Sequence, residues 1–163
     1  VAVNVSARQC LDFGLIPLLE EAIQQANVAP ALLTLEITET AAMRDVDHVV
    51  ALLRQVRALG IGVAVDDFGT GYTSLAYLKR FPLTQIKVDQ SFVRDVARDH
   101  DSAAIVAAII AMAHSLGLPV VAEGVEDAAQ RDFLISHHCD LAQGYFYSTV
   151  LSAEGAASCL RAR

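Results

Sequence analysis

Six apolar runs alternate with segments of helical spacing along this chain, and each run ends at a polar residue. The runs span residues 1–5, 33–37, 61–65, 85–88, 119–122 and 140–142. They are rich in Val, Ile and Leu, as expected for strands that are covered on both faces. Regular alternation of strand and helix predicts an α/β fold with a parallel sheet.

Two of the intervening segments, residues 11–26 and 46–59, repeat apolar side chains at helical spacing. Asp45 precedes the second of them, at a position where acidic residues favour a helix start, and Gly60 stands where such a helix ends. No linker, low-complexity tract or block of charge divides the sequence. We therefore expect residues 1–163 to form a single domain.

Residues 103–122 imitate a membrane span, because they contain no charged side chain. Gly117 and Pro119 interrupt them, and much of the segment is alanine, so a buried helix over 102–116 followed by a strand over 119–123 is the better prediction. A formal net charge of −7 argues against DNA binding. Three widely spaced cysteines favour neither a disulfide framework nor a zinc cluster, and fit the reducing cytoplasm.

Polar residues at the ends of the apolar runs distinguish between two parallel folds. They are Asn4, Glu36, Asp66 with Asp67, Lys87 with Asp89, Glu123 and Gln143. In an open doubly wound sheet, only the groups near a switch point would meet. In a (β/α) TIM-type barrel, all of them converge on one mouth. The barrel is favoured, but a full one takes about 250 residues and eight strands. About six strand-helix units predict an incomplete barrel, with roughly a quarter of it missing or supplied elsewhere.

The chemistry of these strand ends suits a hard cation. Carboxylate and amide oxygens are the ligands that Mg²⁺, Mn²⁺ and Ca²⁺ prefer. Asp66 and Asp67 can both face the mouth only if the chain leaves the pleat there, and Gly69 and Gly71 permit that bend. A carboxylate shared by two cations is a common arrangement in phosphodiester hydrolases. The alternative is that these acids are solvated strand ends.

Lys87 stands between Ile86 and Val88, so its side chain points opposite to theirs, into the predicted mouth. A lysine beside metal-bound carboxylates could hold the attacking water or a phosphate oxygen. The alternative for Lys87 is a structural ion pair with Asp89.

Several motifs together resemble the EAL-domain family of cyclic di-GMP phosphodiesterases, over the whole chain. They are Asn4-Val5-Ser6, Leu35-Glu36-Ile37-Thr38-Glu39, Asp66-Asp67-Phe68-Gly69-Thr70-Gly71-Tyr72, Ile86-Lys87-Val88-Asp89, Glu123-Gly124-Val125-Glu126 and Gln143-Gly144-Tyr145. The resemblance implies the C-terminal two-thirds of an EAL-type barrel, and a hydrolase of bacterial second-messenger signalling. The family's Glu-Ala-Leu motif lies on the first strand of the barrel. That strand would precede Val1, so the resemblance implies that the first strand is the missing one.

The resemblance also implies a role for each motif residue. One Mg²⁺ or Mn²⁺ ion is expected on Asn4, Glu36 and Asp66, and a second on Asp66, Asp67 and Glu123. Lys87 would contact the water between the two ions, and Glu123 could instead be the general base. Supporting roles are implied for Glu39, which would brace the loop containing Gly69, Thr70 and Gly71, and for Asp89, Glu126 and Gln143. The implied reaction is attack of metal-activated water on one phosphodiester of cyclic di-GMP, giving linear pGpG.

Three functional hypotheses follow. The first is a cyclic di-GMP phosphodiesterase, which the resemblance implies to be a homodimer, with GGDEF or sensory domains often preceding it. The second is a catalytically impaired module that binds cyclic di-GMP and signals its presence. The third is a dimerising fragment that completes its barrel with another chain, because unpaired strand edges promote association.

Overall fold

The computed structural model describes residues 1–12, 14–71 and 75–161. Tyr72, the last residue of the motif that begins at Asp66, lies outside these residues. The described strands form one six-stranded sheet in sequence order, and all neighbouring strands are parallel. They are β1 (Ala2–Val5), β2 (Thr34–Thr38), β3 (Gly62–Phe68), β4 (Gln85–Val88), β5 (Val120–Ala122) and β6 (Leu141–Ala142).

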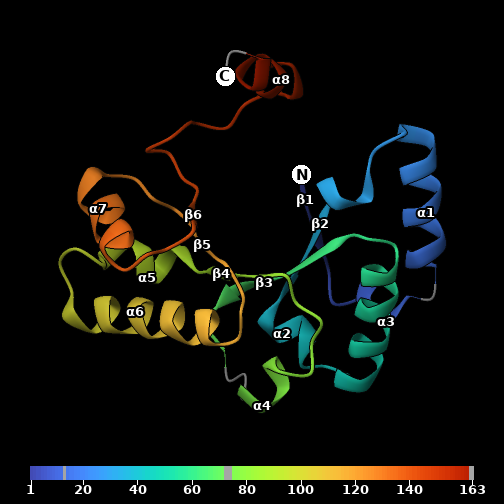
Figure 1. Ribbon diagram of the computed structural model, residues 1–163, viewed down its shortest axis with the longest axis horizontal. Helices are drawn as coiled ribbons and strands as arrows, with labels where there is room; N and C mark the ends of the chain where they lie inside the picture. Colours follow the sequence, from blue (N-terminus) through green and yellow to red (C-terminus); the bar gives the residue numbers. More distant parts are fainter. Residues whose placement is uncertain (13, 72–74, 162–163) are drawn as a thin grey trace.

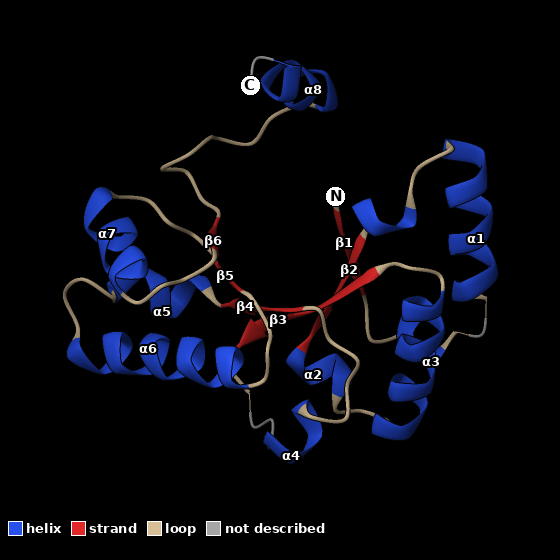
Figure 2. Cartoon of the chain, in the orientation of Figure 1, coloured by secondary structure: helices blue, strands red, loops and turns tan. Residues whose placement is uncertain are grey.

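Helices alternate with these strands and lie on the outer side of a curved sheet (Figures 1 and 2). The longer ones are α1 (Leu15–Ala26), α3 (Val46–Ala58), α6 (His100–Ser115), α7 (Ala128–Ser136) and α8 (Ala153–Arg161). The shorter ones are α2 (Glu39–Ala42), α4 (Leu75–Leu78) and α5 (Gln90–Asp95), with two 3-10 turns, η1 (Gln9–Leu11) and η2 (Pro30–Leu32). The curvature is that of a barrel wall, which confirms the predicted TIM-barrel-like α/β class.

Three of the longer helices begin at side-chain caps. Asp45, Asp99 and Asp127 each accept a hydrogen bond from a backbone N–H in the first turn of α3, α6 and α7, respectively. Gly60 and Gly117 follow α3 and α6 with positive φ angles of 88° and 73°, which a glycine adopts without strain. The predicted helix start at Asp45 and the predicted helix end at Gly60 are therefore confirmed.

The main core lies between the sheet and the outer helices. Ile86 and Val120 on the strands, and Val56 and Val106 on α3 and α6, have no exposed surface. Removing this apolar surface from water stabilises the fold by roughly 25 cal/mol per Å². The core fixes the outward face of each strand, and the alternation of the strand pleat then directs the intervening side chains toward the other face.

The apolar segment 103–122 is divided between α6 and β5, as predicted. Among the described residues, no helix is both long and apolar enough to cross a membrane. Helix α8 has no buried residue and lies apart from the other helices, at the end of an extended segment (Figure 1).

Candidate functional site

The strand register places the predicted site residues on the inner face of the sheet. Asn4 pairs with Glu36 across β1 and β2, and Glu36 pairs with Ala64 of β3. Lys87 of β4 pairs with Val121 of β5. Paired residues of neighbouring strands point to the same face, and the face alternates with each residue. Asp66 therefore shares the face of Ala64, and Glu123 shares that of Val121.

Lys87 lies among three carboxylates from neighbouring segments. Its Nζ lies 2.8 Å from Glu36 Oε2, 2.9 Å from Asp66 Oδ1 and 2.5 Å from Glu123 Oε1. The Lys87 side chain is 4% exposed. Burial is the largest influence on its pKa and lowers it, but the three carboxylates together outweigh burial and raise the pKa of Lys87 above its ordinary value. The three ion pairs of Lys87 thus differ from the alternative pairing with Asp89.

The bend that turns both aspartates toward the site begins at Asp67 itself. Asp67 has a positive φ of 54°, and the pairing of β3 with β4 shifts between Val65 and Phe68. Such a bulge bends a strand and redirects side chains. The expectation that the glycines alone permit the bend was incomplete. Gly69 does have a positive φ of 102°, but it follows the bulge.

Asp66, Asp67 and Glu123 form an acid cluster in which one carboxylate oxygen of each lies within 4.8 Å of the others. Burial raises the pKa of Asp67, and the charges of Asp66 and Asp89 raise it further. Burial likewise raises the pKa of Glu123, which Lys87 partly offsets. Acids that repel one another in this way favour a bound cation, and an oxygen-only set suits a hard divalent one. The residues present therefore fit a hard divalent cation.

Glu36 and Asn4 are placed differently from the acid cluster. Glu36 is 6% exposed and neighbours the cluster through Lys87. Asn4 is exposed on the edge strand β1, beside Glu36 in the register. The sheet thus brings Asn4 to the same side as Glu36, one strand further from the cluster.

Glu39 holds the loop that follows β3. Its Oε2 accepts hydrogen bonds from the backbone N–H of Gly69 at 3.3 Å and of Gly71 at 3.1 Å. A Cβ at Gly71 would lie 2.8 Å from the Glu39 carboxyl, so glycine allows this close approach. Thr70 donates its hydroxyl to the carbonyl of Asp67 at 2.8 Å. These contacts connect the loop to the aspartates.

Gln143 contacts the acid cluster directly. Its Nε2 donates to Glu123 Oε1 at 2.6 Å. This bond orients the same oxygen that contacts Lys87. Gln143 is therefore brought to the site, as its sequence position predicted.

Asp89 and Glu126 border the site. Asp89 caps α5 by accepting from the Ser91 N–H at 2.8 Å, and its charge raises the pKa of Asp67, after burial and the charge of Asp66. The two residues line a cavity of about 230 Å³. The Glu126 side chain is exposed.

Sequence reasoning missed Gln130 of α7. Its side chain is 3% exposed and hydrogen-bonds the backbone that follows Glu123. The spacing Asp127-x-x-Gln130 is a capping-box signature, and it could have indicated the contact.

Fold and site together define a class: parallel strand-helix proteins with carboxylates at the carboxyl ends of the strands. The chain belongs to the EAL domain family, whose model matches residues 1–149.

Two curated relatives come from Pseudomonas aeruginosa. The chain is 45% identical over 154 residues to the bifunctional diguanylate cyclase/cyclic di-GMP phosphodiesterase MucR, covering 94% of the chain and 22% of MucR. It is 46% identical over 162 residues to the cyclic di-GMP phosphodiesterase NbdA, covering 99% and 21%. The chain thus spans about a fifth of the length of these relatives.

Solved structures show the same fold. The PaMucR phosphodiesterase in complex with c-di-GMP superimposes with a TM-score of 0.91 at 45% identity, covering 94% of this chain and 62% of that chain. The manganese/cy-diGMP complex of Klebsiella pneumoniae BlrP1 superimposes with a TM-score of 0.82 at 34% identity, covering 88% and 37%.

Proposed function

We propose that this chain is the catalytic part of a metal-dependent phosphodiesterase that hydrolyses cyclic di-GMP to linear pGpG. The observation that carries the proposal is the convergence of Glu36, Asp66 and Glu123 on Lys87. The relatives named as cyclic di-GMP phosphodiesterases, and the solved complexes with that nucleotide, support the choice of substrate.

The proposed ligands of Mg²⁺ or Mn²⁺ are Asn4, Glu36, Asp66, Asp67 and Glu123. Bound ions would supply a more acidic water and neutralise charge on the phosphate. The raised pKa values of Asp67 and Glu123 support this assignment, because burial and then repulsion from neighbouring acids disfavour their charged forms, and a bound cation would offset both effects. The BlrP1 complex with manganese supports it as well.

The remaining proposed roles belong to the chain's own side chains. The ammonium of Lys87 provides a fixed positive charge beside the acids, where it can hold a phosphate oxygen or the attacking water. Glu123, with its raised pKa, can accept a proton from that water. Gln143 orients the Glu123 carboxyl through its hydrogen bond. Glu39, together with Gly69, Thr70 and Gly71, keeps the loop after Asp67 in place. Asp89 and Glu126 support the border of the site, where both line one cavity.

The test is hydrolysis of cyclic di-GMP with Mn²⁺ or Mg²⁺ by the protein that contains this chain, with the product identified by chromatography. Asp66→Asn should lower kcat by at least about a hundredfold, because it removes a charge at the centre of the site. Asp101→Asn changes an acid that is 93% exposed on α6 and should leave kcat unchanged. Wild-type turnover no faster than that of Asp66→Asn would refute catalysis.

A binding-only module is the second candidate, since the chain covers 62% of the solved PaMucR chain and the remaining part can contain further site residues. Calorimetry that detects cyclic di-GMP binding without product would favour it.

We further propose that residues 1–163 are one domain of a longer cytoplasmic homodimer, with a cyclase or sensory domain. Light scattering and a single cooperative unfolding transition test these assembly proposals.

A further inference from the structure

Gln130 is a buried polar residue on α7 that lies outside the acid cluster. Only 3% of it is exposed. It lies in the first turn of α7, which begins after the 123–127 loop. This loop runs from Glu123 to the helix cap Asp127 and includes Glu126. A buried amide is stable only when its donors and acceptor are paired, so the partners of Gln130 reveal which segments it connects.

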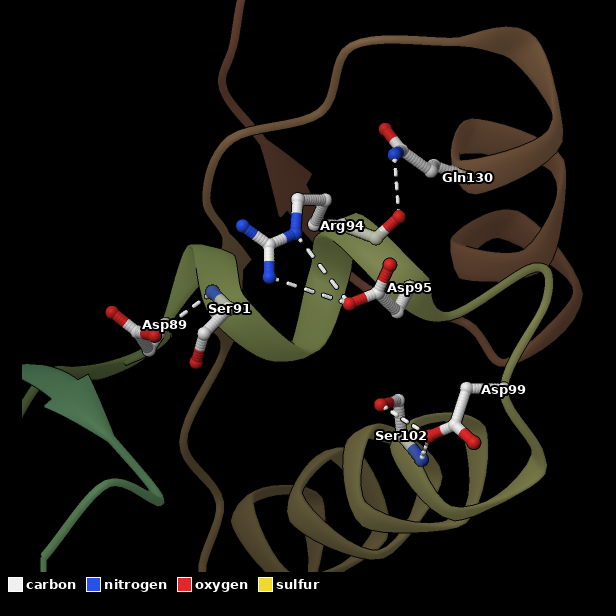
Figure 3. Close-up of polar contacts among 7 residues, drawn as sticks. All are labelled: Asp89, Ser91, Arg94, Asp95, Asp99, Ser102 and Gln130. Carbon is white, nitrogen blue, oxygen red and sulfur yellow. Dashed lines mark hydrogen bonds and ion pairs between the residues drawn. The ribbon is translucent and has the colours of Figure 1, made fainter.

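The carboxamide of Gln130 bonds in two directions. Its Oε1 accepts from the backbone N–H of Glu126 at 2.6 Å and of Asp127 at 3.2 Å. Its Nε2 donates to the carbonyl oxygen of Arg94, in the last turn of α5, at 3.0 Å (Figure 3). Two N–H groups on one side and a carbonyl on the other fix the orientation of the amide. Gln130 therefore joins the 123–127 loop to α5.

The other end of α5 also contacts this loop. A Cβ at Gly124 would lie 2.6 Å from Gln90 Cβ, so the loop packs closely against the first turn of α5. Asp89 caps that turn by accepting a hydrogen bond from the Ser91 N–H. The loop that begins at Glu123 is thus held against α5 at both ends, near Gln90 and through Gln130 at Arg94.

We propose that Gln130 is a positioning residue, which aligns Glu123 with Asp66 and Asp67 by tying the 123–127 loop to α5. The inference rests on the proposed function for its consequence in metal binding. The hydrogen bond that Nε2 donates to Arg94 distinguishes a positioning role from helix capping, since the bonds that Oε1 accepts would by themselves only cap α7.

Two substitutions separate the tie from the cap. Gln130→Glu retains an oxygen for the Glu126 and Asp127 N–H groups, and glutamate is usual at this position of a capping box. It loses the donor to Arg94. Gln130→Met loses both contacts. Asp45→Ala removes the cap of α3, remote from the site, and controls for general destabilisation.

The measurements are Mn²⁺ affinity by calorimetry and hydrogen exchange of the amides of residues 124–127, on the protein containing this chain. Gln130→Glu and Gln130→Met should both weaken Mn²⁺ binding by about tenfold, as expected for a residue that orients a metal ligand. Both should accelerate exchange across the loop, whereas Asp45→Ala should change neither quantity.

Wild-type affinity and wild-type exchange in Gln130→Glu, with losses only in Gln130→Met, would assign Gln130 to helix capping and overturn the inference. If the wild-type protein bound no Mn²⁺, the metal-dependent function would fail, and exchange alone would decide the inference. Unchanged exchange in Gln130→Glu would then overturn it, whereas accelerated exchange would support the tie.

Discussion

Lys87 Nζ lies 2.8 Å from Glu36 Oε2, although the two residues come from β4 and β2 and all of β3 stands between these strands. Asp66 of β3 joins the same ammonium at 2.9 Å. A single buried cation therefore connects three successive strands at their carboxyl ends. The contribution of Lys87 to stability depends on the cost of burying charge, because a buried carboxylate that loses its cationic partner keeps an uncompensated charge.

The first prediction concerns the stability of the metal-free protein. Lys87→Met leaves the carboxylates of Glu36, Asp66 and Glu123 without their shared cation, so the free energy of unfolding should fall by about 3–5 kcal/mol. Urea denaturation in the presence of a chelator measures it. Added Mn²⁺ should restore part of the loss, since a ligand that binds only the folded state stabilises it.

Lys79→Met is the matched control for this substitution. Lys79 is exposed, so its replacement should change the free energy of unfolding by less than about 0.5 kcal/mol. Equal stabilities of Lys87→Met and Lys79→Met would show that the buried ion pairs contribute nothing net.

The second prediction uses the left-handed backbone of Asp67, whose φ is 54°. Asp67→Gly and Asp67→Ala both remove the carboxylate and should weaken Mn²⁺ binding. Glycine adopts this conformation freely, whereas alanine pays about 1 kcal/mol. Asp67→Gly should therefore be the more stable variant in thermal denaturation.

The same pair of substitutions at Asp132 should give the opposite order. Asp132 lies within α7, where alanine exceeds glycine in helix propensity by about 1 kcal/mol. An identical order at both positions would argue against a strained backbone at Asp67.

The third prediction concerns Gly144, which packs against the loop that begins at Glu123. A Cβ there would lie 2.2 Å from the carbonyl oxygen of Val125, so Gly144→Ala must displace backbone. We expect a loss of about 2 kcal/mol in the free energy of unfolding, with weaker Mn²⁺ binding. The displacement also disturbs Gln143, which donates to Glu123.

Gly117→Ala is the control that separates the steric clash of a Cβ from the cost of a positive φ angle. Gly117 also has a positive φ, 73°, but a Cβ there would meet nothing within 4 Å. Its replacement should cost about 1 kcal/mol and leave metal affinity unchanged. If Gly144→Ala were as mild as Gly117→Ala, the close packing at Val125 would be disproved.

The fourth prediction concerns pH and the opposite end of the sheet. His114 lies 2.8 Å from Asp140, and this contact is the main cause that lowers the pKa of Asp140, followed by the N–H of Val120. Near the ordinary aspartate pKa of about 3.9 the folded state then binds fewer protons than the unfolded state. The contribution of Asp140 is present above that pH and is lost as pH falls through the lowered pKa.

Asp140→Asn removes this contribution. The difference in free energy of unfolding between wild type and Asp140→Asn should be larger at pH 6 than at pH 3 and should shrink below about pH 4. Denaturation at a series of pH values measures it. A difference that did not change between pH 6 and pH 3 would contradict the lowered pKa.

Much of the fold follows from local patterns in the sequence. Five strands lie within about one residue of their predicted ranges, because apolar β-branched runs form covered strands, whereas β3 continues past its predicted end to Phe68. Helix α6 begins at His100, two residues before the predicted start, since Asp99 caps it. Asp127 is the cap of α7 in the same way.

Parts of the site could not be predicted in the same way. The left-handed conformation of Asp67 depends on the pairing of β3 with β4, and the contact of Gln130 with Arg94 joins residues 36 positions apart. The three carboxylate partners of Lys87 depend on the curvature of the sheet. Such contacts are set by packing between elements, which local periodicity does not encode.

The sequence by itself determined the strand-helix alternation, the polar groups at the strand ends and the family, because each depends on residue type and spacing. The tertiary structure alone decided which of those groups meet. Parallel strands bring their carboxyl ends to one edge, but distances among Lys87, Glu36, Asp66 and Glu123 depend on strand register, sheet curvature and the bulge at Asp67. These are properties of the packed sheet as a whole.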